Sequence, residues 1–387
     1  MRHRIPLCCA VLLFGCLSLR ASEKWTIQFF HEKEGETFEI VDLECPSVTH
    51  CVAVGDITGP EKPRSTAVIT NDGGAHWAYV RLDESPVSLF FRNALLGWMA
   101  TDRGIWKTED GGEKWKRLKK YKGLEAVWFS DDLHGWAIGS PKLVLRTDDG
   151  GLKWTESPAA SLAKTSADET SYGWMDFGSS GAGVIAGVAG PPAPPPNWMN
   201  PAFSNRVRAG KSKILLLQTK DAGANWKFSE LTALGRLAQV RLAPEDKVLM
   251  VFQARDSYEM PSSLYQFDAA SSGVANLWRS TSRIATDLIL LPGGRALMAA
   301  IQMPGTSAEL VIPGKLRVMT SRNMADWTDI DIDYRAIARS AVFSAADADH
   351  VWLATDTGMI LKLGGTAETK SATAGLSTVL APRNLHN

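Results

Sequence analysis

Short hydrophobic runs recur along the chain, and turns rich in Gly, Asp and Ser separate them. One set of four runs covers residues 124–130, 136–140, 143–147 and 153–157, and the set before it covers 87–91, 97–101, 104–108 and 114–118. The pairs Gly97-Trp98 and Gly135-Trp136 stand at matching positions in the two sets. Short strands joined by tight turns predict hairpins, so each set predicts a four-stranded antiparallel sheet that repeats along the chain.

The turn between the third and fourth runs of a set carries a fixed motif, the Asp box. It reads Ser or Thr, any residue, Asp, any residue, Gly, two residues, then Trp, and it occurs at 70–77, 108–115, 147–154 and 219–226. Its aspartates are Asp72, Asp110, Asp149 and Asp221, and its tryptophans are Trp77, Trp115, Trp154 and Trp226. The carboxylate can accept backbone N–H groups, Gly tolerates a positive φ, and Trp can pack back over the loop. We therefore interpret the box as a structural turn rather than a catalytic group.

Later repeats lose the box but keep the strand pattern. Residues 237–243, 247–253, 264–268 and 277–281 form a set with no true box. At 320–327 the sequence keeps Thr320 and Trp327, but Arg322 stands where the Asp is expected and Met324 where the Gly is expected. That turn must be held in a different way.

The repeats predict an all-β, seven-bladed propeller. First strands begin near Phe38, Pro86, Leu124, Tyr172, Leu237, Thr286 and Arg339. The last repeat has three clear strands, at 339–344, 351–356 and 359–363, and residues 24–29, which include Trp25, can supply the fourth. Such an N-terminal strand would close the ring and remove exposed edges. We expect one propeller domain over 22–365, followed by a C-terminal tail over 366–387.

The Asp boxes, together with the Gly-Trp-Ala-Ile-Gly strand at 135–139, resemble the propeller family of photosystem II assembly and stability factors. The same box occurs in sialidases and other glycoside hydrolases. The resemblance to the assembly factors implies a seven-bladed, non-enzymatic protein that binds another protein during assembly of a membrane complex. It also implies a partner-binding patch rich in arginine, although the boxes do not place its members in this chain.

The N-terminus has the pattern of an export signal. Basic residues at 1–4 precede an apolar run at 5–15 and the segment Ser18-Leu19-Arg20-Ala21. This order predicts a signal peptide over 1–21 and a periplasmic or secreted protein. The run is too short for a permanent membrane helix, which needs about 20 residues. An alternative is that Leu13-Phe14-Gly15-Cys16 directs lipidation of Cys16.

Export leaves Cys45 and Cys51 as the two cysteines of the mature domain. An even pair in an oxidising compartment predicts a disulfide, here across the turn between the first two strands.

Charge gives no sign of a nucleic-acid partner. The chain has 42 Lys plus Arg and 42 Asp plus Glu, so its formal net charge is zero. The sequence shows no zinc-type spacing of histidines and no nucleotide motif, and we expect no cofactor, no metal site and a monomer.

Long connections between second and third strands are the predicted place of function. They lie at 57–65, 191–212, 254–263 and 303–315, on the side of the ring opposite the boxes. A polyproline stretch followed by Trp198 suggests a contact with a protein partner, such as a membrane-complex subunit. The candidate partner-binding residues are Arg103, Trp198, Arg206, Arg208 and Arg255.

Two alternatives remain open from the sequence. The Pro-rich segment can merely cover the centre of the ring, and the arginines can be scattered solvated side chains. A sialidase-like glycosidase or a carbohydrate-binding propeller is the second functional class. Asp56, Asp102 and Asp356 end second strands on the same side, and we interpret them as turn residues rather than as an acid–base pair.

Overall fold

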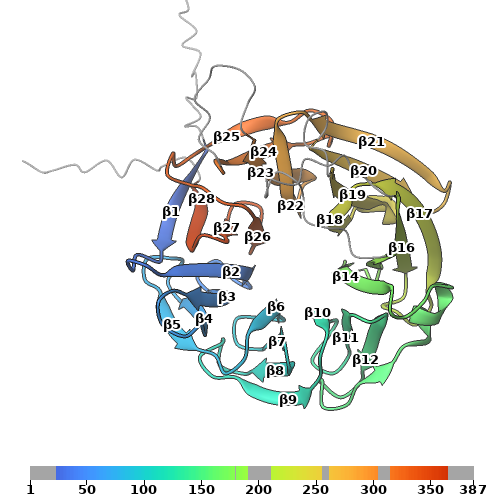
Figure 1. The fold of residues 1–387 in the computed structure, drawn as a ribbon, viewed down its shortest axis with the longest axis horizontal. Helices are drawn as coiled ribbons and strands as arrows, with labels where there is room; N and C mark the ends of the chain where they lie inside the picture. The colour runs from blue at the N-terminus through green and yellow to red at the C-terminus, as the bar shows by residue number, and fades with distance from the viewer. Residues whose placement is uncertain (1–22, 179, 191–210, 255–260, 304–313, 365–387) are drawn as a thin grey trace, which may run out of the picture.

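The computed structural model describes residues 23–178, 180–190, 211–254, 261–303 and 314–364. Figure 1 shows its β-sheets arranged side by side in a ring. The all-β prediction is confirmed, since the only helical segments described are the short 3-10 turns η1 (Pro158–Leu162) and η3 (Pro244–Asp246). None of the described helices is long and apolar enough to cross a membrane.

Five of the sheets have four antiparallel strands in sequence order. They are β2 (Thr37–Glu44), β3 (Cys51–Thr58), β4 (Arg64–Thr70) and β5 (Ala78–Arg81); β6 (Pro86–Phe91), β7 (Gly97–Thr101), β8 (Gly104–Thr108) and β9 (Lys116–Lys120); β10 (Leu124–Phe129), β11 (Gly135–Gly139), β12 (Leu143–Thr147) and β13 (Thr155–Glu156); β14 (Thr170–Phe177), β15 (Gly183–Ala189), β16 (Lys211–Thr219) and β17 (Lys227–Leu234); and β18 (Arg236–Leu242), β19 (Val248–Gln253), β20 (Ser262–Asp268) and β21 (Gly273–Ser280).

The remaining eight strands form one continuous sheet in the order β22-β23-β24-β25-β1-β28-β27-β26. Their bounds are β22 (Arg283–Leu291), β23 (Arg295–Gln302), β24 (Leu316–Ser321), β25 (Thr328–Ile332), β1 (Lys24–Phe30), β28 (Met359–Gly364), β27 (Val351–Thr355) and β26 (Ala341–Ala345). The N-terminal strand β1 pairs antiparallel with β28, where Trp25 lies opposite Leu363, and makes a short parallel contact with β25. The predicted strand at 24–29 thus supplies the missing neighbour of β28.

Burial is greatest in the second strands and least in the outermost ones. The second strands β7, β11 and β27 are buried along their whole length because a neighbouring sheet covers each of their faces. The outermost strand β9, in contrast, has four exposed cationic residues around the half-buried Leu118. Lysines on an outer edge oppose pairing with another chain.

Tryptophans near the start of three second strands, β7, β11 and β27, join their sheets to the next. Trp98 donates its indole N–H to the carbonyl of Gly150, in the box of the following sheet, over 3.0 Å. A Cβ added to Gly223 would lie 2.2 Å from Trp136, and one added to Gly74 would lie 2.4 Å from Trp352. The glycine two residues after the Asp in these boxes, Gly74 or Gly223, is therefore required both for its positive φ and for the space that a neighbouring indole occupies.

Within a box, the hydroxyl and the carboxylate hold the turn together. In the third box the Thr147 hydroxyl donates to Asp149 and accepts the N–H of Gly151, both over 3.0 Å, and Asp149 accepts the N–H of Lys153 over 2.8 Å. The other three boxes repeat these bonds around Asp72, Asp110 and Asp221. The box tryptophans stack edge to face on aromatic rings, as Trp154 does on Phe129.

The degenerate box near 320 differs from the sequence interpretation. Ser321, not Thr320, supplies the hydroxyl that accepts the N–H groups of Asn323 and Met324. Asn323 takes the place of the Asp by accepting the N–H of Asp326 over 2.8 Å, and Met324 adopts the positive φ of 64°. The turn is therefore one residue shorter than the template, which a fixed-spacing alignment cannot reveal.

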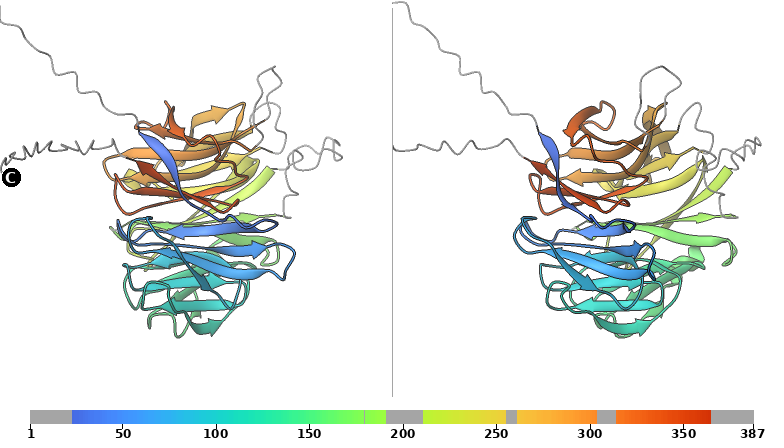
Figure 2. Two further views of the ribbon diagram at one scale, coloured as in Figure 1. Left: turned by 90° about the vertical axis from the view of Figure 1, so that its left-hand side faces the viewer. Right: turned by 60° about the vertical axis from the view of Figure 1, so that its left-hand side comes forward.

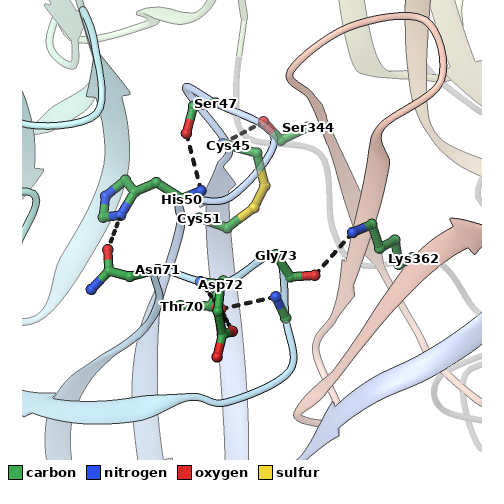
Figure 3. Close-up of a disulfide and its surroundings, with 11 residues drawn as sticks. Cys45, Ser47, His50, Cys51, Thr70, Asn71, Asp72, Gly73, Ser344 and Lys362 are labelled. Carbon is green, nitrogen blue, oxygen red and sulfur yellow. Dashed lines mark hydrogen bonds between the residues drawn. A yellow bond between two sulfur atoms is a disulfide. The ribbon is translucent and has the colours of Figure 1, made fainter.

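The junction between the first sheet and the strands that close the ring is fastened by several bonds (Figure 3). Cys45 and Cys51 form a disulfide across the β2–β3 turn, and the backbone N–H of Cys45 donates to the Ser344 hydroxyl over 2.9 Å. From the other direction, Lys362 donates to the carbonyl of Gly73 over 2.9 Å. The first box and the β2–β3 turn are thus both tied to the C-terminal strands.

Carboxylates on the inner strands link neighbouring sheets near the ring centre. Asp42 accepts the N–H of Leu89 over 2.6 Å, Asp176 that of Leu242 over 2.7 Å, and Asp287 that of Phe343 over 2.7 Å. Asp42 and Asp176 bond to the first strand of an adjacent sheet, whereas Asp287 and Phe343 lie on β22 and β26, the two edge strands of the eight-stranded sheet. All of these strands lie nearest the centre in Figure 1.

One cation faces this group of acids. Arg241 lies 3.1 Å from Asp287, and its charge also acts on Asp42, Glu44 and Asp176. Because these side chains come from β2, β14, β18 and β22, they converge from different sheets. Burial raises the pKa of Glu44 to about 8 and that of Asp42 to about 6, and it also raises the pKa of Asp176.

We expect Asp149→Ala to lower the melting temperature, because the turn loses the acceptor of the Lys153 N–H. Asp148→Ala is the matched control, since Asp148 is the exposed neighbour that pairs only with Arg146 and His134 among the described residues. Thermal unfolding followed by circular dichroism compares them. Equal losses in the two variants would argue against a turn-supporting role.

We expect Glu44→Gln to stabilise the protein at pH 9 but not at pH 5. The folded pKa of about 8 exceeds the ordinary 4.5, so the neutral form stabilises the fold at low pH and that contribution is lost as pH rises through about 8. Gln stays neutral throughout. The test is the melting temperature of Glu44→Gln and of the wild type at both pH values, with Glu156→Gln as the exposed control. A difference between Glu44→Gln and the wild type that is the same at pH 5 and pH 9 would contradict the raised pKa of Glu44.

Candidate functional site

The ring has two unlike faces. The box face carries the Asp boxes and the turns between first and second strands, and the loop face carries the connections between second and third strands. Figure 2 shows the ring from the side, with turns and loops at its two opposite faces. Both ends of the described chain leave from the box face, because Lys24 lies opposite Gly364 in the β1–β28 pair.

Of the predicted partner-binding residues, Arg103 is described and lies on the loop face between β7 and β8. Trp198, Arg206, Arg208 and Arg255 lie outside the described residues. The Arg103 guanidinium donates to the carbonyl of Asp83 over 2.9 Å, and its side chain remains 54% exposed. A hydrogen bond thus positions the Arg103 guanidinium, while about half of the side chain remains exposed to solvent.

Arg103 belongs to a charge cluster around the buried Glu84. The Glu84 carboxylate accepts the Thr101 hydroxyl over 2.6 Å and the Trp106 indole N–H over 2.7 Å. Arg117 approaches it to 3.0 Å and Arg103 to 3.8 Å. Although burial opposes the charged form, these hydrogen bonds and the two guanidinium groups lower the pKa of Glu84. Asp102 also lies 3.5 Å from Arg103, so the two guanidinium groups of the cluster face two carboxylates.

Glu36 forms the centre of a second cluster on the loop face. It pairs with Arg64, Lys33 and His31, and the His31 Nδ1 lies 2.9 Å from the Tyr79 hydroxyl. The hydrogen bonds from Arg64 and then Lys33 lower the pKa of Glu36 to about 2. Since His31 and Lys33 follow β1, the cluster also fastens the end of the N-terminal strand to the first sheet.

A cavity of about 570 Å³ opens beside this second cluster. Its lining includes His31, Lys33, Arg64, Arg81 and the exposed Tyr79. The size lies in the range of about 300–1,000 Å³ usual for ligand sites. Cations and an aromatic side chain around such a cavity suit a ligand that carries an acidic group.

The carboxylates at the ends of second strands are occupied in cross-links. Asp356 accepts both the backbone N–H and Nε of Arg339 over 2.9 Å, and Asp56 accepts the hydroxyls of Ser65 and Ser85. The tight turns that follow β7 and β27 are instead capped by the hydroxyls of Thr101 and Thr355. Asp56 and Asp356 therefore tie neighbouring segments together rather than shape their own turns.

Sequence reasoning missed Glu84 and Glu36. Each lies in a connecting segment beside other acids. The partners of Glu84 come from three separate strands, and Glu36 needs Arg64 from β4, so no local motif marks either residue. Among the described residues, no group of three or more His, Cys, Asp or Glu side chains is arranged to hold a metal ion.

We expect Glu36→Gln to lower the melting temperature at pH 7 and to have no effect near pH 2. The folded pKa of about 2 lies below the ordinary 4.5, so the carboxylate stabilises the fold above pH 4.5 and this contribution is lost as pH falls toward 2. Melting curves between these pH values test it, with Glu34→Gln as the exposed control. Equal curves at pH 7 would refute the proposed fastening of β1.

Comparison with known proteins identifies relatives of both the sequence and the fold. Residues 71–162 match the family described as "Photosynthesis system II assembly factor YCF48". No curated protein matches the sequence significantly.

Solved structures share the fold over nearly all of the chain. YCF48 bound to D1 peptide has a TM-score of 0.58 and 16% identity, covering 88% of this chain and 96% of that one. YCF48 from Cyanidioschyzon merolae has a TM-score of 0.56 and 12% identity, covering 89% and 98%. The tricorn protease has a TM-score of 0.51 and 10% identity, covering 88% of this chain and 36% of that one. Because the fold also occurs in a protease, it does not decide catalysis.

The sequence match falls on the stretch from the first Asp box to the η1 turn, which includes the Glu84 cluster. The resemblance expected from the boxes is therefore confirmed: this chain is a propeller that resembles the photosystem II assembly factor YCF48 family, in sequence over residues 71–162 and in fold over the described chain.

Proposed function

We propose that this protein is an exported, non-enzymatic propeller that binds a segment of a partner protein on its loop face. The single observation that carries the proposal is the cavity on that face, which is lined by the exposed Arg81, the exposed Tyr79 and the half-buried Arg64 that pairs with Glu36. Two observations support a protein ligand. The sequence matches an assembly factor family, and one structure with the same fold is YCF48 bound to D1 peptide.

The proposed architecture has seven blades. It divides the eight-stranded sheet into one blade of β22–β25 and a second of β26–β28 with β1. In this arrangement the first and last strands share a blade, and the loop face presents one second-to-third-strand connection from each blade. The loops with Trp198, Arg206, Arg208 and Arg255 are proposed to extend the same contact surface.

Charge complementarity defines the partner further. Arg81 is exposed, and Arg103 remains 54% exposed although it contacts Glu84, Asp102 and the Asp83 carbonyl. Both lie at the loop-face ends of neighbouring sheets. We propose an acidic segment of a membrane-complex subunit as the ligand, bound by an exported monomer. The leader over 1–21, or a lipid on Cys16 in the alternative, would place the protein at the envelope.

The test is affinity capture from the native envelope extract with residues 22–387 as bait. We expect the wild type to retain a specific membrane-complex subunit and Arg81→Glu/Arg103→Glu to lose it, because the double substitution reverses two loop-face charges. Arg206→Ala/Arg208→Ala tests the long connection separately.

The control is Lys114→Glu/Lys153→Glu, which makes the same charge change on the box face. Retention of the subunit by this control, together with its loss from the loop-face variant, would support the proposal. Loss from both variants, or recovery of no protein by the wild type, would overturn it.

A further inference from the structure

A second cavity, of about 520 Å³, lies on the box face, away from the proposed partner site. Three turns surround it: the fourth Asp box at 219–226, the β18–β19 turn with Glu245 and Asp246, and the β20–β21 turn with Ala269 and Ala270. It therefore lies between two neighbouring four-stranded sheets. Its volume is within the range of small-molecule sites, about 300–1,000 Å³.

Backbone strain is concentrated in these three turns. Six non-glycine residues of the described chain have a positive φ, and four of them are Ala222, Glu245, Asp246 and Ser272, at 53° to 61°. Ala222 stands where the other three boxes have glycine. Residues in this conformation persist where the surroundings impose it, and such residues gather at ligand sites.

An unsatisfied polar group also lines this cavity. Gln218 is 8% exposed, and its Nε2 donates to the carbonyl of Asp246 over 3.1 Å. Its Oε1 accepts no hydrogen bond from the described residues. The positions that precede the other boxes hold Ile69, Lys107 and Arg146, so the buried amide is particular to this sheet. A buried acceptor without a donor calls for a partner, such as a ligand hydroxyl or a water.

The charges around the cavity disfavour an anion. Lys220 pairs with Asp246 at 2.6 Å, and Lys227 donates to the carbonyl of Ala269 over 2.7 Å, so both lysines are engaged. The remaining polar groups include carboxylates, such as Asp221, and amides, such as Asn225. A carboxylate accepts hydrogen bonds, and an amide both donates and accepts them.

Apolar surface completes the lining. Trp226, Leu242 and Ala270 contribute to the wall, and the Trp226 ring is fixed edge to face against Trp136 at 5.2 Å. The fixed indole can pack against an apolar C–H face of a ligand, and the acceptor oxygens and amides beside it can bind hydroxyl donors. These two features together favour a neutral ligand that has apolar C–H faces and many hydroxyl groups. We propose that this cavity binds a neutral oligosaccharide.

The site requires no catalytic step and is independent of the partner-binding proposal. The sugar hydroxyls would donate to Asp221 and to Gln218 Oε1, and the pyranose face would lie on the indole. The fourth box thus serves both as a turn and as a wall of the site, whereas the first three boxes serve as turns.

The experiment is saturation-transfer NMR on the chain 22–387 with a panel of neutral oligosaccharides that includes maltotriose, cellotriose and chitotriose. Ala269→Arg fills the cavity from an outer turn, and Ala325→Arg makes the same change at the corresponding turn between β24 and β25. We expect at least one oligosaccharide to bind the wild type and Ala325→Arg equally, and to bind Ala269→Arg at least about tenfold more weakly.

Gln218→Met removes the unsatisfied acceptor at similar volume, and we expect it to weaken binding while the melting temperature stays within a few degrees. Arg81→Glu/Arg103→Glu should leave sugar binding unchanged, which separates this proposal from the loop-face one. Binding of no panel member, equal binding by Ala269→Arg, or binding of a basic peptide in place of sugar at this cavity would overturn the proposal.

Discussion

The contact on which the ring depends is the insertion of one sheet's tryptophan beneath the next sheet's Asp box. Trp98, Trp136 and Trp352 reach across to Gly150, Gly223 and Gly74. A buried indole provides more apolar contact area than any other side chain, and its N–H can also be satisfied by a carbonyl of the neighbouring turn. The Asp box therefore does more than hold a single hairpin turn, because it also packs against a tryptophan of the adjoining sheet.

This dependence explains why the fold could be predicted from the sequence in some detail. Gly-Trp at the start of a second strand and the box glycine are both local patterns, and they are the two halves of one contact. The closing strand could also be predicted, because Trp25 resembles the Trp that follows each box and stands in an N-terminal stretch that has no hairpin partner of its own. The shifted turn at Ser321 could not be predicted. Ser321 and Asn323 accept backbone N–H groups as the Thr and Asp of the box do, but the turn is one residue shorter, so the fixed spacing of the motif does not detect it.

The candidate sites were harder to predict, for a physical reason. Glu84 is surrounded by Thr101, Trp106 and Arg117, which come from three strands, so its environment exists only after the sheet has formed. Gln218 looks in sequence like any polar residue at the end of a strand, and its burial depends on Asp246 in the next sheet. The exposed position of Arg103 could be predicted, because a tight turn between two strands contains it.

The pairing of Trp25 with Leu363 has a consequence for how the chain becomes a ring. Apart from the short contact of β1 with β25, every other strand pair joins strands that are consecutive in the sequence, but the β1–β28 pair needs both ends of the domain at once. Such distant contacts form late because a long loop must close before they contribute any energy. A growing or translocating chain would therefore hold an open arc with two uncovered strand edges until its final strand is released, and in that interval it would be most open to aggregation and to chaperones.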